Sequence, residues 1–209
     1  MGGTFLKVMV IGNGGREHAI VWKLSLSPFI TKIYCCPGNG GTAKIAENVT
    51  LNPLTIHTMA DFAVKNQIDL TVVGPETYLA EDVVTEFQKR GLKIYGPSGK
   101  ASRLEASKSY AKEFMRKYKI PTARFEVFDD PSSAKQYLET VGAPIVIKAN
   151  GLAAGKGVTV AMDKQTAIQA IDEIMTQRVF GEAGSSIVIE EFLEGEEVSL
   201  LAFCDGKTA

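Results

Sequence analysis

Two glycine-rich segments carry charged side chains and have the composition of phosphate-binding sites. The first, Gly12-Asn13-Gly14-Gly15-Arg16-Glu17, separates an apolar run from a segment with helical spacing. Glycines between a strand and a helix let the main chain approach a phosphate, and the first N–H groups of the helix point toward the anion. Arg16 adds a charge-assisted contact. This segment predicts a site for a short phosphate, such as that of a sugar monophosphate.

A dinucleotide is not the expected ligand of this loop. The pattern G-x-G-x-x-G requires a third glycine where Glu17 stands. The next predicted strand ends in Cys35-Cys36-Pro37, where such a site needs an acid for the ribose. The residues leave one simpler alternative open: the glycines only make turns, and Arg16 and Glu17 begin a solvated helix.

Two further loops are expected beside the first. Pro37-Gly38-Asn39 and Gly74-Pro75-Glu76 each follow a predicted strand. Open α/β sheets bind ligands at the carboxyl ends of their parallel strands. The carboxylate of Glu76 is suited to hold ribose hydroxyls or an amine.

The second glycine-rich segment runs from Lys148 to Gly157. Its spacing is one residue short of a Walker loop, and Gly157 stands where a Ser or Thr would bind magnesium. Because a strand follows it instead of a helix, we expect a hairpin lid that closes over phosphates while Lys148 neutralises their charge. A solvated lysine at the hairpin tip is the alternative for Lys156.

An apolar strand with an acidic end lies near the end of the chain, at residues 187–197. We expect a purine ring to lie against it, recognised by main-chain groups near Glu190 and Leu193. Glu197 is then placed to hold both ribose hydroxyls. Taken alone, the segment also fits a solvated acidic turn.

Alternating elements position the first loops. Apolar runs between helical segments predict parallel strands buried on both faces, joined by right-handed crossovers. This order is typical of a Rossmann-like α/β domain. The predicted strands are 5–11, 30–36, 69–73 and 92–95, and the predicted helices are 16–26, 58–65 and 80–90.

The pattern changes near Arg103, where we place a domain boundary between residues 1–103 and 104–209. A strand followed directly by a glycine loop and another strand predicts an antiparallel hairpin inside an α+β unit. The turn-like end at 205–208 leads us to expect that the chain is a fragment. The second domain is expected to contain helices 106–118, 131–141 and 164–177 and strands 124–128, 145–149, 157–161, 186–191 and 197–204.

The composition favours a cytoplasmic protein with small-molecule ligands. Lys and Arg number 23 against 24 Asp and Glu, so no overall charge attracts nucleic acid or an anionic membrane. No apolar run reaches the length of a membrane span, and the first residues lead into a strand without a signal peptide. Cys35, Cys36 and Cys204 form neither an even set nor a zinc pattern, which favours reduced thiols.

These segments together resemble the ATP-grasp enzymes, and specifically the phosphoribosylamine-glycine ligase (glycinamide ribonucleotide synthetase) family. The fold implied is a pre-ATP-grasp domain followed by a truncated ATP-grasp domain whose lid subdomain covers 122–193. The resemblance runs through the whole chain. It rests on segments 10–19, 37–39, 73–76, 145–148, 151–158, 189–193 and 195–197.

The resemblance implies ATP-dependent joining of glycine to 5-phosphoribosylamine through glycyl phosphate, without a covalent enzyme nucleophile. The implied ATP-binding residues are Lys108, Lys148, Gly151, Gly155, Lys156, Gly157, Glu190, Glu191, Leu193 and Glu197. The implied phosphoribosylamine-binding residues are Gly12, Asn13, Gly14, Gly15, Arg16, Glu17, Pro37, Gly38, Asn39, Pro75 and Glu76. Asn150 departs from the acid often found at its position in the family.

The resemblance covers about the N-terminal half of the family. ATP and Mg²⁺, or Mn²⁺ in its place, are the implied cofactors, and the metal-binding residues are expected beyond Ala209. Later purine-pathway enzymes are the implied protein partners. The chain by itself is expected to bind nucleotide weakly and not to turn over. Another ATP-grasp ligase and a non-catalytic nucleotide-binding module remain the alternatives.

Overall fold

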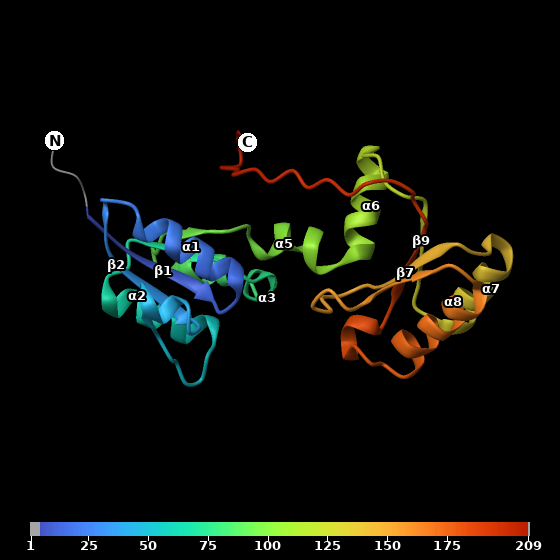
Figure 1. Cartoon of the computed structure of the whole chain (residues 1–209), viewed down its shortest axis with the longest axis horizontal. Coiled ribbons are helices and arrows are strands. Elements are labelled where there is room, and N and C mark those ends of the chain that lie inside the picture. The colour runs from blue at the N-terminus through green and yellow to red at the C-terminus, as the bar shows by residue number, and fades with distance from the viewer. Residues whose placement is uncertain (1–4, 209) are drawn as a thin grey trace. The chain divides into compact units, whose positions relative to one another are not determined.

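The structure is a computed structural model that describes residues 5–208. The chain divides into two compact units (Figure 1). The first contains the residues up to Phe114 together with Asn150–Leu152, and the second contains Met115–Ala149 together with the residues from Ala153 onward. No helix within residues 5–208 combines the length and the apolar character that a membrane span needs.

The first unit is built on a parallel sheet, as predicted, and its strand order is β3-β2-β1-β4-β5. The central strand β1 has Val8–Ile11 fully buried, because helices cover both faces of the sheet. The pattern does not predict β3, which is only two residues long. The strands are β1 Leu6–Gly12, β2 Ile30–Pro37, β3 Glu47–Asn48, β4 Leu70–Val73 and β5 Ile94–Tyr95.

Alternate residues of β1 face two separate parts of the core. Val10 packs with Val21 of α1 on one face, whereas Met9 and Ile11 pack with residues of α2 and α4 on the other. The helices of this unit are α1 Gly15–Ser25, α2 Ile56–Asn66, α3 Glu76–Ala80, α4 Val83–Lys89 and α5 Gly99–Ala106, with a 3₁₀ turn η1 at Thr42–Lys44. Helix α6, Lys108–Tyr118, begins in this unit and ends in the second.

Two predicted helices differ from the observed ones. The helix expected at 80–90 is interrupted at Asp82, whose backbone is left-handed with φ of 63°. Its carboxylate accepts hydrogen bonds from the Gly99 N–H at 2.6 Å and the Thr85 hydroxyl at 2.8 Å, which ties the break to the start of α5. The helix expected at 106–118 starts at Lys108, because Ser107 adopts an extended backbone between α5 and α6.

The second unit is built on an antiparallel sheet in the order β6-β9-β7-β8, which confirms the predicted hairpin of β7 and β8. Helices α7 Pro131–Val141 and α8 Lys164–Ile171 pack on the sheet face that carries Ile147 and Ile189. A π-helical turn, Asp172–Thr176, continues α8, and a 3₁₀ turn follows at Gly181–Gly184. The strands are β6 Phe125–Phe128, β7 Ile145–Ala149, β8 Val158–Ala161 and β9 Ile187–Glu191.

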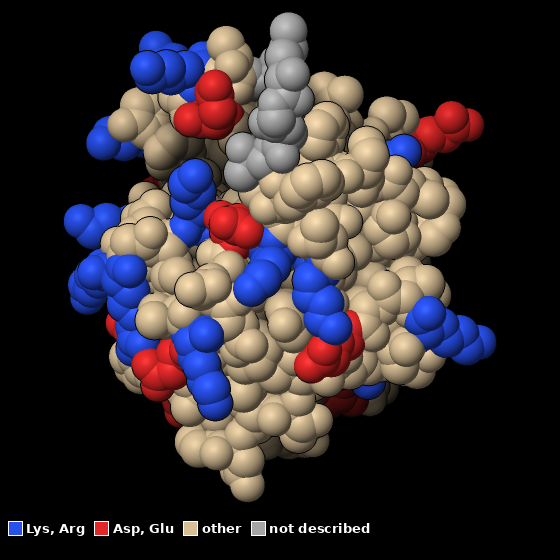
Figure 2. Space-filling model, turned by 90° about the vertical axis from the view of Figure 1, so that its left-hand side faces the viewer, with Lys and Arg blue, Asp and Glu red and all other residues tan. Residues whose placement is uncertain are grey.

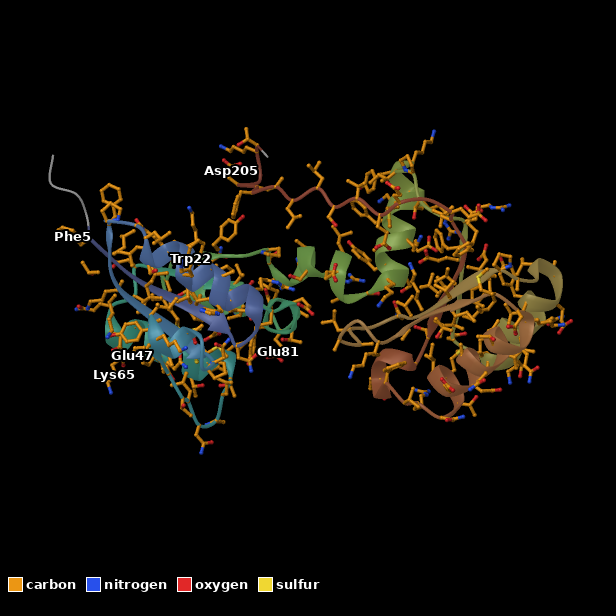
Figure 3. The ribbon with its side chains drawn as sticks, viewed as in Figure 1. Phe5, Trp22, Glu47, Lys65, Glu81 and Asp205 are labelled. Atoms are coloured by element: carbon orange, nitrogen blue, oxygen red, sulfur yellow. The ribbon has the colours of Figure 1, made fainter. Side chains whose placement is uncertain are left out.

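The strand predicted at 197–204 is wrong, since residues 192–208 contain neither helix nor strand. A strand requires a neighbour to complete its main-chain hydrogen bonds, and no strand of residues 5–208 pairs with this segment. Val198 is 90% exposed and Leu200 is 96% exposed. The segment ends in a bend in which Asp205 (Figure 3) accepts the N–H groups of Lys207 and Thr208.

Candidate functional site

The three loops expected to bind a ligand lie at the carboxyl end of the parallel sheet (Figure 1). They follow β1, β2 and β4, and the chain changes its winding direction between β1 and β4, which is where open α/β sheets bind ligands. Arg16 joins two of the loops. Its Nη1 donates to the Gly74 carbonyl at 2.6 Å and lies 3.7 Å from the Glu76 carboxylate.

Glu17 is buried beneath these loops, with only 4% of the residue exposed. Its Oε2 accepts the Gly14 N–H at 2.6 Å. A Cβ added at Gly12 would lie 2.5 Å from its Cγ, and a Cβ added at Gly74 would lie 2.0 Å from its Oε1. Glu17 therefore fills the space that side chains at both glycines would need. The alternative in which it begins a solvated helix is wrong for Glu17.

Asn39 connects the loop after β2 to the loop after β1. Its amide nitrogen donates to the carbonyls of Asn13 at 2.9 Å and Gly14 at 3.1 Å. Its amide oxygen accepts the N–H groups of Gly41 at 2.7 Å and Thr42 at 3.0 Å. The sequence pattern does not predict this network, because no local spacing marks the partners of an asparagine side chain.

The structure also places charges together on the sheet of the second unit. Lys148 Nζ lies 3.0 Å from Glu190 Oε2, and the Glu190 side chain is only 6% exposed. Lys148 pairs with Val188, and Val146 pairs with Glu190, so the two charged residues are diagonal neighbours on one face. That face is opposite the core formed with α7 and α8. A strand lysine is thus held by a buried carboxylate.

The glycine segment after Lys148 forms the predicted hairpin. Ala149 donates its N–H to the Gly157 carbonyl at 2.7 Å, and Lys156 donates to Ala153 at 2.9 Å. Ala154 and Gly155 at the turn both have positive φ, 48° and 76°, as a tight hairpin turn requires. Lys156 is exposed at the tip.

Lys108 begins α6 and contacts the start of the glycine segment. Its Nζ donates to the Gly151 carbonyl at 3.0 Å. Asn150 caps the same helix, because its side-chain oxygen accepts the Ser109 N–H at 2.9 Å. A neutral helix cap therefore stands where the resemblance leads us to expect an acid.

The other predicted ATP residues lie at the end of β9 or in the segment after it. Glu191 bonds to the main-chain N–H of Arg124 at 2.9 Å and to its Nε at 2.6 Å. Leu193 and Glu197 are both exposed in the segment that follows β9.

The next features are the possible metal ligands and the cysteine thiols among the residues that the structure describes. Within residues 5–208, no three His, Cys, Asp or Glu residues lie together as metal ligands. Cys35 and Cys36 are buried, and all three cysteines are free. Burial raises the pKa of Cys36 to about 11 and also raises that of Cys35, so both remain protonated thiols at neutral pH.

The face shown in Figure 2 carries no continuous basic surface among its described residues. There, Lys and Arg side chains stand among Asp, Glu and uncharged residues.

Two family models match consecutive parts of the chain. A model described as the phosphoribosylglycinamide synthetase N domain matches residues 6–105, and one described as the ATP-grasp (A) domain of the same enzyme matches residues 106–209. The chain belongs to the phosphoribosylglycinamide synthetase family. Its fold is accordingly a parallel α/β domain followed by part of an ATP-grasp domain.

Similar curated proteins carry the same family name. Phosphoribosylamine–glycine ligases from Caldanaerobacter subterraneus and Escherichia coli are 50% and 49% identical to this chain, each over 97% of it and 48% of their own length. A bifunctional purine biosynthetic protein from Pichia angusta is 50% identical over 96% of this chain and 26% of its own length. The chain therefore spans about half the length of the two ligases.

Solved structures support the same fold. The phosphoribosylamine–glycine ligase of Thermotoga maritima has a TM-score of 0.70 and 33% identity, covering 91% of this chain and 45% of that one. The N5-carboxyaminoimidazole ribonucleotide synthetase of Thermotoga maritima, at 19% identity and a TM-score of 0.64, shares the fold alone.

Proposed function

We propose that the protein containing this chain joins glycine to 5-phosphoribosylamine, using ATP, and releases glycinamide ribonucleotide, ADP and phosphate. The family match along residues 6–209 carries the proposal. The convergence of three loops at the carboxyl end of the parallel sheet adds a physical reason. We place this reaction in purine biosynthesis, as the name of one relative suggests. We also propose that it takes place in the cytoplasm.

The loops of the first unit are proposed to bind phosphoribosylamine. Arg16 and the first N–H groups of α1 offer positive charge to its phosphate. Glu76, whose carboxylate lies 3.7 Å from Arg16, is available to a ribose hydroxyl or to the amine. The residues proposed to form this site, either by contact with the substrate or by holding the loops in place, are Gly12, Asn13, Gly14, Gly15, Arg16, Glu17, Pro37, Gly38, Asn39, Pro75 and Glu76.

ATP is proposed to bind at Lys148 and the glycine hairpin. A lysine already ordered by Glu190 can receive phosphate oxygens without first losing side-chain freedom. The hairpin N–H groups then cover the phosphates and exclude water. The proposed ATP contacts are Lys108, Lys148, Gly151, Gly155, Lys156, Gly157, Glu190, Glu191, Leu193 and Glu197.

The chemistry activates a carboxylate that is by itself a poor electrophile. A glycine carboxylate oxygen attacks the γ-phosphorus of ATP, ADP leaves, and glycyl phosphate forms. The amine of phosphoribosylamine then attacks the glycyl carbonyl, loses a proton, and releases phosphate. Enclosure protects the acyl phosphate from water between the two steps. Mg²⁺ would stabilise the negative charge of the ATP phosphates. Within residues 5–208, no three His, Cys, Asp or Glu side chains lie together to hold it.

The test is ADP release by the complete gene product with glycine, phosphoribosylamine, ATP and magnesium. Turnover that depends on both glycine and the amine is the expected result. Bicarbonate or another carboxylate replacing glycine would reveal a different ATP-grasp reaction, and nucleotide binding without any turnover would indicate a binding module.

The loop assignment has its own test. Arg16→Ala is expected to raise the KM for phosphoribosylamine and to leave ATP affinity unchanged. An ATP defect of similar size would show that the loop serves the other ligand.

A further inference from the structure

The side chain of Asn39 uses all of its hydrogen-bonding capacity within the protein. A primary amide has two N–H donors and an oxygen that accepts two hydrogen bonds. Both donors are directed to main-chain carbonyls, of Asn13 and Gly14, and the oxygen receives the N–H groups of Gly41 and Thr42. This leaves the amide without a free group to offer a substrate.

A second layer of contacts holds Asn39 in this orientation. Its own N–H donates to the Thr42 hydroxyl oxygen at 2.7 Å, and its carbonyl accepts from Asn48 Nδ2 at 2.8 Å. The Thr42 hydroxyl lies 2.7 Å from Asn48 Oδ1, and Thr42 is fully buried. A connected network around a buried hydroxyl fixes one side-chain conformation of Asn39.

The Gly14 residue is held from two sides. Asn39 binds its carbonyl, and the buried carboxylate of Glu17 binds its N–H. Gly14 also immediately precedes α1, so its orientation sets the direction of the first N–H groups of that helix. Clamping both polar groups of one glycine fixes a loop that glycines would otherwise leave mobile.

We propose that Asn39 is a positioning residue of the phosphoribosylamine site: it orients the loop after β1 through the carbonyls of Asn13 and Gly14 and does not contact the substrate. The proposal rests on the proposed function. Its benefit is preorganisation, because a loop ordered before binding does not lose that freedom when the substrate arrives.

Kinetics of the complete gene product test the proposal with two substitutions. Asn39→Ala removes the hydrogen bonds that hold the Asn13 and Gly14 carbonyls. It is expected to raise the KM for phosphoribosylamine by about tenfold or more, with the KM for ATP changed less than about twofold. Asn39→Asp is expected to be at least as damaging, because its carboxylate would face the two carbonyls that the amide now binds.

Asn66→Ala is the matched control. The Asn66 side chain donates one hydrogen bond, to the Phe62 carbonyl at 2.9 Å. Asn66 is the last residue of α2, which leads into the amino end of β4, whereas the substrate loops follow the carboxyl ends of the strands. Loss of this hydrogen bond is expected to leave the KM for phosphoribosylamine unchanged. An equal rise in the control would reduce Asn39 to a general structural role and overturn the proposal. So would an Asn39→Asp variant that binds the amine as well as wild type, since its carboxylate lacks the N–H donors through which Asn39 holds the Asn13 and Gly14 carbonyls.

A measurement on the wild-type protein covers the case in which neither variant folds. With ¹⁵N-labelled asparagine, both side-chain amide protons of Asn39 should exchange slowly before any substrate is added. Adding ribose 5-phosphate should not slow them further, and protection that appears only with ribose 5-phosphate would refute the clamp. This readout needs no turnover, so it stays informative if wild type releases no ADP and the proposed function itself fails.

Discussion

Replacing Gly74 by alanine is expected to cost the first unit much more stability than one methyl group normally does. The added Cβ would lie 2.0 Å from Glu17 Oε1 and 2.5 Å from its Cδ, far inside contact distance. Glu17 cannot simply swing into water, because it is buried and holds the Gly14 N–H at 2.6 Å. The methyl group must therefore strain the site or break that bond.

The expected loss in the free energy of unfolding is about 2 kcal/mol. Overpacking a filled site costs about 1–3 kcal/mol. Breaking a hydrogen bond to a charged group costs about 1.5–3 kcal/mol, and the protein adopts whichever response is cheaper. Alanine also reduces the freedom of the unfolded chain, which offsets about 0.4–1 kcal/mol.

Urea denaturation followed by tryptophan fluorescence measures this loss within the first unit. Trp22 is the single tryptophan of the sequence and lies on α1 (Figure 3), so its emission reports on that unit. Gly15→Ala is the control for adding a methyl group, because no atom lies within 4 Å of a Cβ at that position. We expect this control to be neutral or slightly stabilising.

A double-mutant cycle isolates the cause. In a Glu17→Ala background the obstructing carboxylate is gone, and Gly74→Ala should then cost less than about 0.5 kcal/mol. Costs that simply add, or a Gly74→Ala variant as stable as Gly15→Ala, would refute the reasoning.

Three further outcomes are expected. Lys148→Ala should weaken ATP binding, measured by calorimetry, more than Lys156→Ala does. The reason is that Glu190 already orders the strand lysine Lys148, whereas Lys156 at the hairpin tip must become ordered on binding. Equal losses of ATP affinity would contradict this prediction. Ala154→Gly should raise the unfolding free energy by about 0.5–1 kcal/mol, because alanine is strained at a φ of 48°, and a lower melting temperature would count against it. Hydrogen bonds from Gly99 and Thr85 lower the pKa of Asp82 below its ordinary 3.8, so the Asp82 carboxylate stabilises the fold above that pH and loses this effect as the pH falls through the lower folded pKa. The difference in unfolding free energy between wild type and Asp82→Asn should therefore shrink below about pH 4. A difference that does not change with pH would contradict this prediction.

Local patterns in the sequence determined the elements and the glycine loops of this protein. Apolar runs bounded by glycine or proline identify β1, β2 and β4, because a strand buried on both faces needs no alternation. The strand–glycine–strand order identifies the β7–β8 hairpin, because turn residues act over four positions. Arg16 and Lys148 were identified as charged residues beside those loops for the same local reason.

Tertiary structure alone decided what several of these residues do. Arg16 donates a hydrogen bond to a carbonyl 58 residues away in the sequence, and Asn39 donates to carbonyls 25 and 26 residues away. Local sequence patterns do not predict partners at such separations. Glu17 looks like a solvated first-turn acid in the sequence, but the packing of two glycine loops around it makes it a buried acceptor. The sequence at 197–204 predicts a strand, yet a strand forms only where a neighbour completes its hydrogen bonds. Side-chain identity is local, whereas the partner that satisfies a buried polar group is supplied by the fold.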